Sequence, residues 1–133
     1  MKWLRVLLIL VVSVQCSFGQ TQSEMNSEAE AEYAKAQTEM NRVYQQILKD
    51  YGDDDVFISK LKTSQNLWVQ FRDAEFNMKF PVEDTYEYYG SMYPMCSAYY
   101  LTSLTNERTK KLREWIENPK SDDGCSGSVM FRN

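Results

Sequence analysis

Residues 21–51 contain neither proline nor glycine, and no other feature of this chain constrains its fold as strongly. Apolar side chains recur there at intervals of mainly three or four residues, the period of one face of an α-helix. Thr21 and Glu24 have the spacing of a capping box, and Gly52 suits the position just after a helix end. The stretch predicts one long amphipathic helix. Its expected buried stripe comprises Met25, Ala29, Ala36, Met40, Val43, Ile47 and Tyr51.

A second helical segment follows this first one. Asp53, Asp54 and Asp55 offer an N-cap, and Pro81 ends the segment because proline cannot continue a helix. Its expected buried side comprises Ile58, Leu61, Trp68, Phe71, Ala74 and Met78.

A third helical segment is expected after a loop over residues 81–90. Ser91 can cap it, Pro94 is tolerated in its first turn, and Pro119 stops it. Its apolar positions are Met95, Tyr99, Leu101, Leu104, Leu112, Trp115 and Ile116.

These signals predict an all-α fold, since no segment has the pattern of a strand. Short connections between long helices favour antiparallel neighbours, so we expect an up-down-up bundle of three long helices over residues 20–118. Residues 119–133 are rich in Gly, Ser and Asp, and are expected to form a flexible C-terminal tail.

Residues 1–19 have the pattern of a secretory signal peptide. Lys2 and Arg5 give a positively charged start, and an unbroken apolar run follows Arg5. Ser17 and Gly19 supply the small residues that precede a cleavage site. We therefore expect an exported protein, periplasmic or extracellular, with no integral membrane segment after cleavage.

Two alternatives apply to this N-terminal segment. A membrane anchor needs roughly 20 apolar residues, and polar residues interrupt this segment sooner. Lipid attachment at Cys16 is the other alternative, although Gln15 is larger than the residue that such chemistry prefers before the cysteine.

The charge of the chain indicates the kind of partner it can bind. The net charge is -4, and loss of Lys2 and Arg5 with the leader would make it -6. An acidic domain without a basic stripe is a poor nucleic-acid binder and suits a cationic protein partner. The chain has no histidine, which excludes Ser-His-Asp and Cys-His catalysis and His-ligated zinc. No cofactor or metal is expected.

The densest polar cluster is interpreted as structural rather than catalytic. Asp73 and Glu75 are two residues apart on a helix, so their side chains point in different directions and cannot share a substrate. We expect Arg72 or Arg108 to pair with a carboxylate across a helix interface, and no catalytic residues. The cluster comprises Gln65, Arg72, Asp73, Glu75 and Arg108.

The segment from Pro81 to Tyr93 is the better candidate for function. Tyrosines give a large contact area with little entropy to lose, and carboxylates beside them suit a basic partner. The alternative is an ordinary loop whose tyrosines cover the end of the bundle. The candidate partner-binding residues are Glu83, Asp84, Tyr86, Glu87, Tyr88, Tyr89 and Tyr93.

Two cysteines remain after the leader is removed, Cys96 and Cys125. In an oxidising compartment an even number of cysteines predicts a disulfide between them. Two unpaired thiols are the alternative.

Several segments resemble the bacterial lysozyme inhibitor LprI-like family over about residues 24–113. That family's pattern has a Met-Asn opening, a Leu-Asn-x-x-Tyr segment, and then Gln-x-x-Trp-x-x-Phe-Arg-Asp-Ala-Glu-Cys. It continues with Gly-Gly-Ser and Leu-Thr-x-x-Arg. The matching positions are Met25, Asn26, Met40, Asn41, Tyr44, Gln65, Trp68, Phe71, Arg72, Asp73, Ala74, Glu75, Gly90, Ser91, Leu104, Thr105 and Arg108.

The chain departs from the family pattern at cysteines. Family members usually carry cysteine at the position of Phe76, often carry another at that of Tyr100, and commonly have one near Glu28. The joint replacement of the first two implies that Phe76 and Tyr100 face each other across the second and third helices, with an aromatic contact in place of a bridge.

The resemblance implies a small exported helical protein, and the family name implies inhibition of lysozyme. Our first hypothesis is a non-enzymatic binding protein that inhibits a cationic lysozyme by occluding its active-site cleft. The alternative is a structural or interaction module of the cell envelope with no role toward lysozyme. An envelope hydrolase is a third hypothesis, which no nucleophile motif supports.

Overall fold

The computed structural model describes residues 20–117 and 124–129, and within them the fold is all-α, with no strand. The predictions for residues 1–19, and most of those for the tail, lie outside the described residues. The all-α prediction is confirmed. The four α-helices are α2 (Gln22–Asp50), α3 (Asp55–Lys79), α4 (Thr85–Tyr89) and α5 (Tyr93–Arg113), and a 3-10 turn, η1, covers Gly124–Ser126.

The ends of the first two helices follow from local side-chain chemistry. The Thr21 hydroxyl accepts a hydrogen bond from the Glu24 backbone N–H at 3.2 Å, and the Glu24 carboxylate accepts one from the Thr21 N–H at 2.8 Å. This capping box confirms the predicted start of α2. Asp54 caps α3 by accepting from the Phe57 N–H at 2.8 Å, and α3 ends two residues before Pro81.

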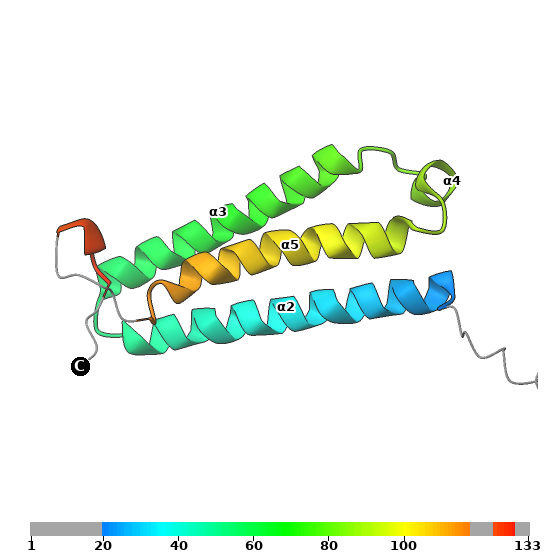
Figure 1. The fold of residues 1–133 in the computed structure, drawn as a ribbon. Coiled ribbons are helices and arrows are strands. Elements are labelled where there is room, and N and C mark those ends of the chain that lie inside the picture. Colours follow the sequence, from blue (N-terminus) through cyan, green and yellow to red (C-terminus); the bar gives the residue numbers. More distant parts are fainter. Residues whose placement is uncertain (1–19, 118–123, 130–133) are drawn as a thin grey trace, which may run out of the picture.

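The helices α2 and α5 lie side by side and run in the same direction, while α3 runs in the opposite direction (Figure 1). Most of the contacts between helices join α2 to α5, and α3 adds far fewer. Contacts from α3 to α5 and its C-terminal turn include Phe57 with Trp115, Gln65 with Arg108 and Glu75 with Tyr100. In these three pairs the residue number on the α5 side falls as the residue number on α3 rises. The two helices are therefore antiparallel.

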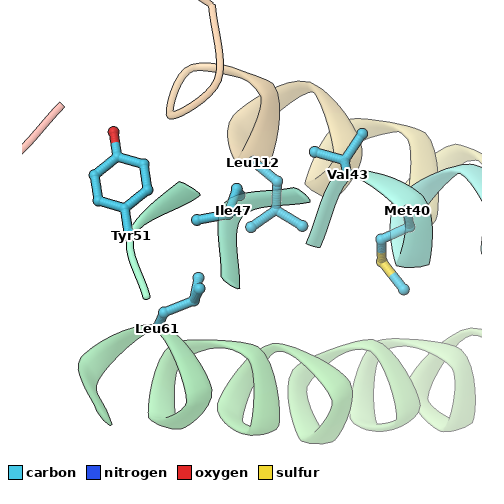
Figure 2. Packing of buried hydrophobic residues seen from close by; sticks show 6 residues of the cluster. All are labelled: Met40, Val43, Ile47, Tyr51, Leu61 and Leu112. Atoms are coloured by element: carbon cyan, nitrogen blue, oxygen red, sulfur yellow. The ribbon is translucent and has the colours of Figure 1, made fainter. Parts of the chain in front are cut away.

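The hydrophobic core lies where the three long helices meet (Figure 2). The stripe predicted on α2 is buried from Ala29 to Tyr51, and Met25 is half-buried. The Tyr51 ring stacks on Phe57 with centroids 4.4 Å apart, and its hydroxyl donates to the Trp115 carbonyl at 2.9 Å. The core cluster comprises Met40, Val43, Ile47, Tyr51, Leu61 and Leu112.

The prediction of which residues are buried on α3 is wrong in part. Leu61 alone is fully buried on this helix, whereas Phe71 and Met78 are more than half exposed and Ala74 is exposed. Small buried residues on α2 and α5 explain the difference, because small side chains let two helix axes approach closely. They are Ala29, Ala36, Ala98, Thr105 and Thr109. The helix α3 meets this pair mainly through long side chains.

Three predictions about the third helix and the segment before it need correction. The expected loop over residues 81–90 contains α4. Ser91 does not cap α5: the N-cap is Met92, without a side-chain hydrogen bond, and the Ser91 carbonyl instead accepts from the Asn26 side chain at 3.1 Å. The helix α5 ends at Arg113, before the predicted stop at Pro119, and a turn follows.

An ion pair with no signal in the sequence joins α2 to α5. The Glu39 carboxylate binds Arg42 on its own helix at 2.7 Å and Arg113 on α5 at 2.6 Å. Both arginines stabilise the ionised carboxylate, Arg42 most strongly, and they lower the pKa of Glu39 to about 2.

The substitution Glu39→Gln is expected to destabilise the fold near neutral pH by about 0.5–1 kcal/mol, because the carboxylate is partly exposed. A lowered pKa means that the charge stabilises the fold above the unfolded-state pKa of about 4.3. That contribution is lost as the pH falls toward 2, so the difference between wild type and variant should shrink there. Chemical denaturation from pH 7 to pH 2.5 measures it.

Glu32→Gln is the matched control for this prediction. Glu32 pairs with Lys35 on the same helix and is more exposed than Glu39, so its loss should change stability by less than about 0.5 kcal/mol. Equal stability of the Glu39 variant and wild type at pH 7 would contradict the proposed effect of the ion pair.

Candidate functional site

The short helix α4 forms at one end of the bundle because its two termini are fixed by local signals (Figure 1). The Asp84 carboxylate accepts a hydrogen bond from the Glu87 backbone N–H at 3.1 Å. Gly90 ends the helix with a positive φ of 75°, and its N–H donates to the Tyr86 carbonyl at 2.9 Å. A side chain at Gly90 would be strained in this conformation.

An aromatic cluster centred on Phe80 attaches this end to the long helices. The Phe80 ring has its centroid 5.3 Å from Phe76, 5.5 Å from Tyr89 and 5.2 Å from Tyr93. Tyr89 and Tyr93 also stack on each other at 5.6 Å. Such ring contacts stabilise an arrangement beyond simple burial. The position of α4 is therefore set by the C-terminal cap of α3 and the first turn of α5.

The seven candidate partner-binding residues divide into two groups. Tyr89 and Tyr93 pack on Phe80 and support the structure. Tyr86 and Tyr88 are 74% and 69% exposed, and the three carboxylates are also exposed, although Asp84 serves as the cap of α4. The surface available to a partner, which we call the α4 tip, comprises Glu83, Tyr86, Glu87 and Tyr88.

The start of α2 makes the surroundings of the α4 tip strongly acidic. Hydrogen bonding of Asn26 to Ser91 holds the first turns of α2 beside the residues that follow α4. Neither residues 20–34 nor residues 80–107 contain a lysine or arginine. The sequence shows both acidic groups, but only the fold places them at the same end. The carboxylates of this acidic end are Glu24, Glu28, Glu30, Glu32, Glu83, Asp84 and Glu87.

Arg108 and Gln65, from the predicted polar cluster, meet across the interface of α3 and α5. The Arg108 guanidinium donates to the side-chain amide oxygen of Gln65 and to the Ser64 hydroxyl, both at 3.0 Å, rather than to a carboxylate. Partial burial lowers the pKa of Arg108. Gln65 in turn lies 3.7 Å from the Met40 sulfur, so these residues link all three long helices.

The other three members of the polar cluster make separate contacts. Arg72 pairs with its neighbour Asp73 at 2.7 Å and lies 5.5 Å from the centre of the Trp68 ring. Glu75 accepts a hydrogen bond from the Tyr100 hydroxyl at 3.2 Å. Burial is the largest cause of the raised pKa of Tyr100, and the bond to Glu75 adds to it. Gln65, Glu75 and Arg108 thus make contacts between helices, whereas Arg72 and Asp73 contact each other within α3. The five residues do not converge on one reactive point.

Phe80 connects the two positions where the resemblance implied an aromatic contact. Its ring centroid lies 5.3 Å from Phe76 and 6.3 Å from Tyr100. Tyr100 also receives the Lys79 ammonium over its ring at 4.5 Å. Phe76 and Tyr100 therefore belong to one cluster, in which Phe80 contacts both rings.

The groove between α2 and α3 gathers many of the residues that carry the family resemblance. It has a volume of about 590 Å³, and its lining includes Met40, Asn41, Tyr44, Gln65 and Arg72. This groove runs along the two helices, whereas the α4 tip lies at the end of the bundle.

The structure contains no disulfide between Cys96 and Cys125, so this prediction is wrong for the described residues. Cys96 is exposed in the first turn of α5. Figure 1 shows the η1 segment, which contains Cys125, beside the opposite end of the bundle. From Cys96 to the end of α5 at Arg113 the helix rises about 26 Å, which is far beyond bridging distance.

A search of the same described residues finds no helix long and apolar enough to cross a membrane. Nor do these residues contain three His, Cys, Asp or Glu side chains grouped as metal ligands.

Comparison with known proteins gives one family and one curated relative. The relative is an uncharacterised protein of Rhizobium meliloti (strain 1021), 28% identical over 118 residues, which cover 80% of this chain and 81% of the relative. No solved structure matches the chain. The family model of the lysozyme inhibitor LprI matches residues 15–112, which is most of the chain. The chain therefore belongs to the lysozyme inhibitor LprI family.

Proposed function

We propose that this protein is an exported, non-enzymatic inhibitor of lysozyme that covers the active-site cleft with the α4 tip. The observation that carries the proposal is the division of the tyrosines. Tyr89 and Tyr93 attach α4 to Phe80, and Tyr86 and Tyr88 remain exposed on that support. Exposed aromatic side chains on a fixed element are typical anchors of protein–protein interfaces.

The tyrosines and carboxylates would have different roles in the complex. The catalytic carboxyl groups of a lysozyme lie in its cleft, so an acidic side chain would be repelled from the deepest point. Tyr86 and Tyr88 carry no charge and can fill a cleft that binds sugar rings. Glu83 and Glu87 would then contact the basic surface around the cleft.

The acidic end would also speed the encounter with a cationic enzyme. Residues 20–34 and 80–93, which lie at this end, contain seven carboxylates and no lysine or arginine. Clustered charge of one sign raises association rates, and salt weakens the effect within a screening length of about 10 Å at 0.1 M. The encounter should therefore be fast at low salt and orient the α4 tip toward the enzyme.

The test is a titration of cell-wall lysis by a cationic lysozyme with the exported protein, at low and moderate salt. Stoichiometric inhibition that weakens with salt is the expected result. No inhibition at either salt concentration, from protein shown to be helical by circular dichroism, would contradict the proposal. The envelope interaction module without a role toward lysozyme would then be the better interpretation.

A charge-reduced variant tests the acidic end separately. Glu83→Gln with Glu87→Gln is expected to slow association about fivefold at low salt, because the charges act mainly on the encounter rate. The control is Glu114→Gln with Glu117→Gln, which removes the same charge beyond the C-terminal end of α5. Stopped-flow or surface-based kinetics gives both rates. An equal effect of the two variants would mean that net charge, and not its position, governs the encounter.

A further inference from the structure

The side of α3 that faces away from α2 and α5 carries four large exposed apolar side chains. Val56, Leu67, Phe71 and Met78 are 72%, 59%, 53% and 68% exposed. At 3.6 residues per turn, all four lie within about 60° of one another around the helix. Single exposed apolar residues are ordinary, but a line of them along one helix marks an interaction surface.

Three smaller or linear side chains complete this line. Thr63 and Ala74 fall on the same side of the helix and are also exposed. Lys60 stands at the edge of this side, is exposed, and also lines a pocket between α3 and α5. We call the seven positions the outer stripe of α3. They are Val56, Lys60, Thr63, Leu67, Phe71, Ala74 and Met78.

The spacing of the outer stripe is symmetrical about Leu67. Its members stand 4, 7 and 11 residues before Leu67 and 4, 7 and 11 residues after it. Leu67 is also the midpoint of α3, which runs over 25 residues from Asp55 to Lys79. Two copies of α3 packed antiparallel about a twofold axis at Leu67 would therefore overlap along their whole length, about 37 Å.

This antiparallel pairing matches side chains of complementary size. Leu67 meets its own copy at the axis, and Phe71 meets the smaller Thr63. The Lys60 stem lies along Ala74, and Val56 meets Met78. Each contact occurs twice, as a twofold interface requires. No shift of one helix along the other would preserve all four pairings.

The charges around the outer stripe favour a second copy over other partners. The chain is acidic, so most of its surfaces repel a second copy, but the charges on and beside this stripe of α3 sum to zero. Lys60 is the one charged member of the stripe. The residues one position before each member are all exposed; Ser59, Asn66, Gln70 and Asn77 are uncharged, and Asp55, Lys62 and Asp73 are charged. A membrane-binding helix would carry an excess of lysines and arginines beside its apolar side, and a cationic partner would need an excess of carboxylates. Neither excess is present, because Lys60 and Lys62 are balanced by Asp55 and Asp73.

We propose that the protein forms a twofold-symmetric dimer through the outer stripe of α3. The α4 tip follows the C-terminal end of α3, so antiparallel packing places the two tips at opposite ends of the dimer. Each tip stays exposed. The dimer does not depend on the proposed function, and it would make an inhibitor bivalent.

In analytical ultracentrifugation at about 100 µM, the exported protein should sediment at twice the chain mass. This high concentration is needed because an interface of one helix per copy is small and its affinity modest. Leu67→Lys brings two lysines together at the axis and should weaken the dimer at least about 30-fold. Asn66→Lys adds the same charge one residue away, off the stripe, and should change the affinity less than about threefold. Both side chains are exposed, and circular dichroism confirms folding.

A disulfide test checks the register of the two helices. With Cys96 and Cys125 replaced by serine, Leu67→Cys should form an intermolecular disulfide under mild oxidation, whereas Asn66→Cys should not. A monomeric wild type, equal weakening by both lysine variants, or preferred cross-linking at residue 66 would each overturn the proposal. Binding of a monomeric wild type to phosphatidylglycerol vesicles would identify a lipid surface as the occupant instead.

Discussion

Replacing Tyr86 and Tyr88 by alanine is expected to weaken lysozyme inhibition at least about 100-fold. Truncation of a tyrosine at the centre of an interface costs at least about 2 kcal/mol, which is about 30-fold in affinity for each residue. The two effects need not add fully, because neighbouring interface residues are coupled. The inhibition constant, measured by titration of cell-wall lysis, checks the prediction.

The stability of the same double variant should stay close to that of wild type. Tyr86 and Tyr88 are mostly exposed, and substitution of exposed residues usually changes the free energy of unfolding by less than about 0.5 kcal/mol each. The Phe80 cluster keeps its contacts to Tyr89 and Tyr93, so α4 should remain attached. Thermal unfolding followed by circular dichroism separates lost binding from lost structure.

Tyr99→Ala is the matched control for the loss of inhibition. Tyr99 is 48% exposed on α5, outside the α4 tip, so its removal should leave inhibition within about twofold of wild type. Full inhibition by the Tyr86 and Tyr88 double variant would rule out the α4 tip as the binding surface. The groove between α2 and α3 would then become the next surface to test.

The helical class and the ends of α2 and α3 could be predicted because their signals are local. Thr21 and Glu24 form the predicted capping box, and Asp54 caps α3 within the predicted group of aspartates. The stripe on α2 was also informative, since its apolar residues lie on one side only. Helix α4 was missed because five residues between Pro81 and Gly90 show no periodicity, although Asp84 was a visible cap signal.

The buried side of α3 could not be predicted with the same success because this helix is apolar on two sides. Leu61 and Trp68 lie toward the other helices, whereas Leu67, Phe71 and Met78 lie on the outer stripe. A single sequence shows both sets of positions but not which set meets α5. The close approach of α2 and α5 through their small buried residues decided that question.

The candidate site was predicted in composition but not in arrangement. The sequence shows four tyrosines and three carboxylates over residues 83–93, yet only the position of Phe80 determines which tyrosines are covered. Glu39 and Arg113 are 74 residues apart, and no spacing rule connects them. Contacts of this kind depend on helix register, which the fold sets.

Leu112→Ala is expected to give the largest loss of stability, about 3 kcal/mol. Leu112 is 1% exposed and contacts the core cluster where all three long helices meet, with Ile47 from α2 and Leu61 from α3 (Figure 2). Removal of a buried leucine side chain costs 2–5 kcal/mol, from lost burial and the cavity left behind. In a domain of this size the melting temperature should fall by roughly 10–20 °C.

Leu67→Ala makes the same chemical change on α3 and is the control. Leu67 is 59% exposed, and alanine favours helix slightly more than leucine, so the free energy of unfolding should change by less than about 0.5 kcal/mol. Both variants are compared at low micromolar concentration, where any dimerisation contributes least to stability. Equal destabilisation would show that α3 is buried on its outer side in the folded monomer. That result would contradict the core described above, in which Leu61 and not Leu67 is the buried leucine of α3. It would also leave no exposed outer stripe for a dimer.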